Sequence, residues 1–170
     1  HGLQAAFILQ QVPLSIAKQK YPEISGVETT ESVEAKIEQL DFSDVNRKLM
    51  SEESEGWSAD YTRSVEKDYR RFLHLYLKYG NEYDIVPQFP VDKFWHAHIL
   101  DTRKYEQDCR FLNGQFIHHY PYFGMNGPED EREFKKAAGE TEKLYQAEFK
   151  TDAAWIHCNS HQAGPCAPAP

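Results

Sequence analysis

The sequence has little cysteine and no long apolar run. Three cysteines, Cys109, Cys158 and Cys166, are spread over 170 residues. This is an odd number in a chain large enough to fold without disulfide bonds, so we expect reduced thiols. The apolar stretch near the start, Ala5 to Leu9, is far shorter than the roughly 20 residues that a membrane span requires, and it lacks the cleavage pattern of a secretory signal. We therefore expect a cytoplasmic protein with no membrane partner.

Positive charge is scarce as well. Lys and Arg together number 19 against 27 Asp and Glu, which gives a formal net charge of −8. Nucleic-acid binding depends on clustered cations that neutralise phosphates, so a nucleic-acid partner is not expected. A chain of 170 residues suits one hydrophobic core. We expect one domain over residues 1–150 and a tail at 151–170 that contains His, Cys and Pro.

Familiar catalytic patterns are absent from the sequence. It has no Gly-x-Ser-x-Gly elbow, no phosphate-binding loop, no His-Glu-x-x-His helix and no dinucleotide fingerprint. These absences remove the hydrolases, nucleotide-binding proteins and zinc proteases that such motifs define. Any chemistry must then come from another constellation of side chains.

Apolar side chains recur at helical spacing through most of the chain, which predicts an all-α protein. The clearest case is an amphipathic helix from Ser58 to Tyr79, with Gly80 after its end. Further helices are expected from Glu31 to Leu40, from Ser43 (as the cap) to Leu49, from Val91 to Gly114 and from Glu129 to Phe149, and residues 3–20 suggest two short helical pieces or an arm. The expected fold is a compact single-domain helical bundle with an irregular tail.

Six of the eight histidines lie in two short windows, at residues 95–120 and 155–162. A transition metal needs three or four lone pairs that converge at roughly 2.0 to 2.3 Å, and imidazole and thiolate suit Zn, Fe or Cu. The first window therefore predicts a metal site within the helical domain. The expected ligands are His96, His98, His118, His119, Cys109 and Asp92.

Helical geometry limits how these ligands combine. His96 and His98 are about 200° apart on a regular helix, so both cannot point at one ion from its middle. Asp92 and His96 are i, i+4 neighbours on one side, whereas His98, Tyr105 and Cys109 follow another side. One ligand from each side is one possibility. The other is that one histidine coordinates and the other packs in the core.

The adjacent residues His118 and His119 face different ways in any regular structure, so we expect only one of them to coordinate. Which one does so stays open at this point. The carboxylates of Asp92, Asp101 and Asp108 are candidates either to bind the ion or to orient a binding imidazole.

The tail offers a second set of possible ligands. His157, Cys158, His161 and Cys166 have suitable side chains, but their spacing matches no standard zinc motif. A second site in the tail therefore stays open. The remaining histidine of the helical region, His74, lies in the amphipathic helix between Leu73 and Leu75 and is expected to be structural or exposed.

The run from Val91 to Thr102, followed by Tyr105, Asp108-Cys109, Gly114 and the segment His118 to Gly124, resembles the glycine-rich domain-containing protein-like family. The resemblance covers residues 61–149 and suggests a small, bacterial-type, stand-alone member, although Ala and Pro stand where the family has a long glycine run. It implies that eight residues match the family's motif positions: Asp92, His96, His98, Tyr105, Asp108, Cys109, His118 and His119.

Three functions are compatible with such a cluster. The first is a metal-dependent oxidoreductase, an oxidase or oxygenase, acting on a small molecule or peptide in a pocket between the two C-terminal helices. In it Tyr105 or Asp101 would transfer protons. The second is a structural zinc site in a module that binds a protein partner. The third is a metal-handling protein whose tail captures an ion and passes it to the core cluster.

Overall fold

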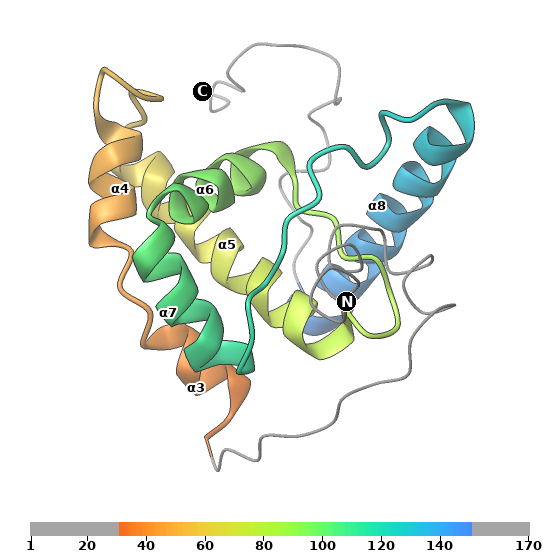
Figure 1. Cartoon of the computed structure of the whole chain (residues 1–170), viewed down its shortest axis with the longest axis horizontal. Helices are drawn as coiled ribbons and strands as arrows, with labels where there is room; N and C mark the ends of the chain where they lie inside the picture. Colours follow the sequence, from red (N-terminus) through yellow and green to blue (C-terminus); the bar gives the residue numbers. More distant parts are fainter. Residues whose placement is uncertain (1–30, 151–170) are drawn as a thin grey trace, which may run out of the picture.

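The computed structural model describes residues 31–150, and in this part of the chain it has helices and no strand, which confirms the all-α prediction (Figure 1). The helices are α3 (Val33–Glu38), α4 (Ser43–Met50), α5 (Ala59–Tyr79), α6 (Phe89–Leu100), α7 (Thr102–Asn113) and α8 (Pro128–Phe149). The arm expected at residues 3–20 and the possible tail ligands lie outside the described residues.

The helix ends follow from local chemistry. Ser58 Oγ accepts a hydrogen bond from the backbone N–H of Tyr61 and so caps α5. Ser43, expected to cap α4, is instead its first residue, and the carboxylate of Asp41 accepts from both the N–H and the hydroxyl of Ser43. Gly114 ends α7 with a φ of 71°, a conformation that costs glycine little.

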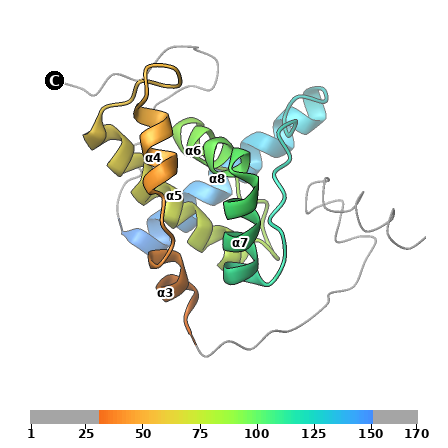
Figure 2. The ribbon, with the colours of Figure 1, turned by 60° about the vertical axis from the view of Figure 1, so that its left-hand side comes forward.

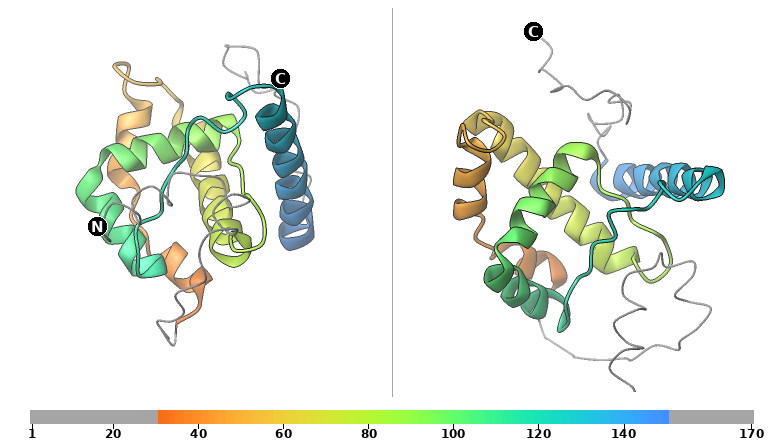
Figure 3. Two further views of the ribbon diagram at one scale, coloured as in Figure 1. Left: turned by 45° about the vertical axis from the view of Figure 1, so that its right-hand side comes forward. Right: turned by 45° about the horizontal axis from the view of Figure 1, so that its top comes forward.

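Helix α5 is the centre of the fold. It packs against α3, α4, α6 and α8, and Figure 2 shows α3 and α4 next to it on one side. Its buried stripe includes Val65, Tyr69, Phe72 and Leu73. Helix α8 packs against α5 and lies on the opposite side of it from α3 and α4 (Figure 3).

The helix expected from Val91 to Gly114 is in fact two helices, because the chain turns at Asp101. This residue has φ −81° and ψ 72°, which lies outside the helical region. Its side chain accepts a hydrogen bond from the N–H of Lys104 and caps α7. The turn lets both helices direct apolar side chains into the core, and it brings Asp108 of α7 to His98 near the end of α6.

Residues 114–127 connect α7 to α8 without a helix of their own and run along the molecule beside α6 and α5 (Figure 1). Ile117 anchors this crossing segment because its side chain is buried in the core. At the far end, the carboxylate of Asp130 accepts hydrogen bonds from the N–H groups of Gly124 and Asn126. Gly124 has a φ of 89°, and a Cβ there would meet the Phe134 ring at 2.9 Å, so glycine is required.

Candidate metal site

Asp92 and His96 lie one turn apart on the outer side of α6. Their side chains are 29% and 44% exposed, and His96 Nε2 is 3.5 Å from Asp92 Oδ2. The opposite side of this helix carries Val91, Phe94 and Trp95 into the core. The apolar residues of α6 therefore fix its rotation, and this rotation presents the carboxylate and the imidazole together at the surface.

His119 comes to the same place from the crossing segment. Its Nε2 lies 2.6 Å from His96 Nε2 and 3.1 Å from Asp92 Oδ1. The three residues form a group whose ligand atoms all lie within 4.8 Å of one another, and such a group could hold a metal ion. Ligand atoms about 2.1 Å from one ion and at right angles to each other are about 3.0 Å apart, close to these separations.

The indole ring of Trp95 packs against the imidazole ring of His119. The two rings are stacked with centroids 4.4 Å apart and planes 21° apart. His119 is only 14% exposed, whereas His96 opposite it is 44% exposed. The group is therefore covered on the Trp95 side and open to solvent on the His96 side.

His98, a predicted ligand, occupies a different environment. It is 2% exposed, and both ring nitrogens have partners inside the protein: Nδ1 lies 2.9 Å from Tyr69 Oη and Nε2 lies 3.0 Å from Asp108 Oδ2. Burial tends to raise the pKa of Asp108, but the hydrogen bonds from His98 and Lys104 outweigh it and lower that pKa. The structure does not bring His98 to the Asp92, His96 and His119 group.

Tyr105 and Cys109 project from α7 toward the backbone of the crossing segment. Tyr105 Oη accepts from Trp95 Nε1 at 2.9 Å and donates to the carbonyl of Ile117 at 2.5 Å. Burial raises the pKa of both the Tyr105 phenol and the Cys109 thiol. Both side chains are buried, and neither belongs to the group that could hold a metal.

Two further predicted residues also lie apart from the group. His118 is not a member of the group, and its ring contacts the Phe116 ring, with centroids 4.8 Å apart; burial lowers its pKa. Asp101, considered for proton transfer, is the exposed cap of α7.

Sequence reasoning paired Asp92 with His96 and left open which of His118 and His119 joins them. It did not identify Trp95 as the support for His119, nor Tyr69 as the partner of His98. One feature of the sequence indicates the role of Trp95: it lies directly before His96 in a helix that is apolar on its other side. No feature of the sequence indicates that Tyr69 pairs with His98, because the two are 29 residues apart.

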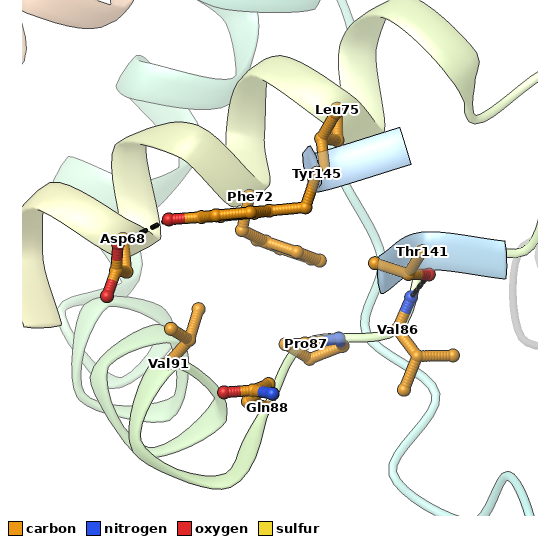
Figure 4. A pocket seen from close by; sticks show the side chains of 9 residues that line it. All are labelled: Asp68, Phe72, Leu75, Val86, Pro87, Gln88, Val91, Thr141 and Tyr145. Atoms are coloured by element: carbon orange, nitrogen blue, oxygen red, sulfur yellow. Dashed lines mark hydrogen bonds between the residues drawn. The ribbon is translucent and has the colours of Figure 1, made fainter. Parts of the chain in front are cut away.

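The pocket shown in Figure 4 is lined by residues of α5 and α8, by the chain leading into α6 and by Val91 in the first turn of α6. It is mainly apolar. Tyr145 crosses it and donates a hydrogen bond to Asp68 Oδ1 at 2.7 Å, and the Val86 N–H donates to Thr141 at its edge. Neither Asp92, His96 nor His119 lines this pocket.

Fold and site together define an all-helical protein with a surface group of two histidines and one aspartate that could hold a metal ion. None of the helices in residues 31–150 is long and apolar enough to cross a membrane. The chain belongs to the UCP032817-like family, whose model matches residues 32–140, more than half of its length. Neither the curated proteins nor the solved structures gave a match.

The resemblance to the glycine-rich domain-containing protein-like family was therefore wrong. The motif residues that suggested it lie on α6, on α7 and in the crossing segment. The family match extends well beyond that run and includes α3 and α4, which precede the region of the supposed resemblance. The description of the matched family names no reaction.

Proposed function

We propose that this protein binds one divalent transition-metal ion through Asp92, His96 and His119 and uses it as a metal-dependent oxidoreductase. The observation that carries the proposal is the convergence of two imidazole Nε2 atoms and one carboxylate, with separations of 2.6, 3.1 and 3.5 Å. Two histidines and one carboxylate with open positions are the ligand set typical of non-haem iron(II) oxygenases. Iron is therefore the preferred ion, ahead of copper or zinc.

The exposure of the group supports a reactive rather than a closed site. Structural zinc sites have four protein ligands and no open position, whereas catalytic sites leave room for water or substrate. Here three residues converge, and His96 is 44% exposed. A small molecule or an exposed peptide side chain could approach from that side. A structural zinc module has less support from this geometry.

Within this proposal the residues of the chain have distinct roles. Asp92 and His96 hold the ion from a rigid helix, and His119 closes the group from the crossing segment. The ion would supply Lewis acidity or a redox couple where a substrate meets it. Tyr105 and Asp101 are engaged in internal contacts, so proton transfer is better assigned to solvent that enters beside His96.

The test is metal binding by the full chain and its single variants. Metal-free protein is titrated with Fe(II) under anaerobic conditions, and with Co(II) and Zn(II), by calorimetry and absorption spectroscopy. We expect one ion per chain, and each of D92A, H96A and H119A should weaken binding about 100-fold or more, because even partners outside the ligand set are worth 10 to 100-fold.

The matched control is H118A, which removes an imidazole next to His119 that contacts Phe116 instead of the group. It should leave the affinity within a factor of about three of the wild type. Stoichiometric binding that survives H96A and H119A would place the ion elsewhere. Deleting residues 151–170 tests the metal-handling alternative, which requires metal uptake to fall.

Addition of azide or nitric oxide to the Fe(II) protein tests whether a coordination position is open. A change in the absorption or EPR spectrum supports a reactive site. A spectrum that does not change would favour a closed structural site.

A further inference from the structure

His119 is the member of the candidate site that lies outside any helix, so its position depends on contacts that fix the crossing segment. Asp92 and His96 are held by α6, whose backbone is regular. A metal site needs its ligands fixed to within about 0.5 Å. Something other than secondary structure must therefore hold the backbone near residue 119.

One tyrosine of α7 makes that connection. The Tyr105 hydroxyl donates to the carbonyl of Ile117, two residues before His119, at 2.5 Å. The same oxygen accepts from Trp95 Nε1 at 2.9 Å. Trp95 in turn stacks on the His119 ring, with centroids 4.4 Å apart. Tyr105 therefore contacts both the backbone two residues before His119 and the tryptophan that stacks on the His119 ring.

These contacts are shielded from water. Tyr105 is 2% exposed, and Trp95 and Ile117 are each 3% exposed. Water cannot readily replace the two hydrogen bonds when the phenol oxygen is removed. The Trp95 indole and the Ile117 carbonyl would both lose their partner, and His119 would lose its fixed position relative to His96.

We propose that Tyr105 is a positioning residue for the metal site, acting on His119 through the Ile117 carbonyl and the Trp95 ring. This rests on the proposed metal binding by Asp92, His96 and His119. Tyr105 does not touch the ion, and its role is to keep three ligand atoms at the separations that one ion requires.

The experiment compares Y105F with Y69F in the full chain. Both substitutions remove one buried phenol oxygen from the core, but the Tyr69 hydroxyl pairs with His98, away from the site. Co(II) affinity and the Co(II) absorption spectrum are measured well below the Tm of each variant. We expect Y105F to weaken Co(II) binding about 10 to 100-fold and to alter the spectrum. Y69F should retain the wild-type spectrum and an affinity within about threefold.

Equal Co(II) affinity and an unchanged spectrum in Y105F would overturn this inference while leaving the metal site intact. Absence of Co(II) binding in the wild type would instead remove the proposed function itself. If Y105F does not fold, W95F provides the second test, because it keeps an aromatic ring next to His119 but removes the indole N–H that donates to Tyr105, together with the five-membered part of the indole. Weaker binding by folded W95F than by Y69F supports the inference, and wild-type binding by W95F overturns it.

Discussion

At the scale of single residues, two histidines two positions apart in α6 have opposite environments. His96 is 44% exposed and faces Asp92 and His119, whereas His98 is buried between Tyr69 and Asp108. The difference follows from helical geometry, because a step of two residues turns the side chain by about 200°. One imidazole is available to a metal ion, and the other satisfies buried polar groups.

The substitution H98A should therefore affect stability and not metal binding. It leaves the Tyr69 hydroxyl without its partner and removes one hydrogen bond from the Asp108 carboxylate, both in buried surroundings. We expect the free energy of unfolding to fall by about 3 kcal/mol, as measured by urea denaturation. H118A, the comparison, should cost less than about 1 kcal/mol. Loss of metal affinity in a fully stable H98A would contradict this assignment.

At the scale of elements, α8 is held to α5 by a polar cluster near its C-terminal end. The Glu148 carboxylate accepts hydrogen bonds from Lys78 Nζ at 2.7 Å and from the Tyr79 hydroxyl, and it lies 3.3 Å from His74 Nε2. The other ring nitrogen of His74 lies 3.3 Å from a Glu34 oxygen on α3. His74, expected to be structural or exposed, thus links three helices.

This cluster predicts a defined pH dependence of stability. The hydrogen bonds from Lys78 and then Tyr79 lower the pKa of Glu148 from 4.5 to about 2. A carboxyl group whose pKa is lower in the folded state stabilises the protein above pH 4.5, and that stabilisation disappears as the pH falls toward 2. The difference in free energy of unfolding between the wild type and E148Q should therefore shrink over this range.

The control for this measurement is E133Q on the same helix. Glu133 is 56% exposed and its oxygen lies 4.0 Å from Lys136 Nζ, so its substitution should have a small effect at every pH. Chemical denaturation at several pH values gives both differences. A gap between wild type and E148Q that stays constant down to pH 2 would contradict the role of Glu148.

At the scale of the whole molecule, the candidate site connects two described parts of the chain, α6 and the crossing segment, that form no backbone hydrogen bonds with each other. Asp92 and His96 belong to α6, and His119 belongs to the segment that leads to α8. An ion bound by all three binds the folded state and not the unfolded chain. Metal binding is therefore expected to stabilise the whole described fold.

Differential scanning calorimetry tests this coupling. A metal ion at 100 times its Kd should stabilise the protein by about 2.7 kcal/mol, and the Tm should rise further with metal concentration. In H96A and H119A, whose Kd is expected to be about 100-fold higher, the same metal concentration should stabilise the protein by about 0.4 kcal/mol or less. An equal rise in these variants would mean that the ion acts at another place.

The sequence by itself determined the helical fold class and most helix positions, since periodic apolar residues, caps and prolines act locally. It also paired Asp92 with His96, because residues four apart on a helix are neighbours whatever surrounds them. The tertiary structure alone decided that His98 faces Tyr69 and that His119 rather than His118 reaches α6. These outcomes depend on contacts between residues far apart in the chain, such as the bond from Tyr105 to Ile117, and local spacing does not encode them.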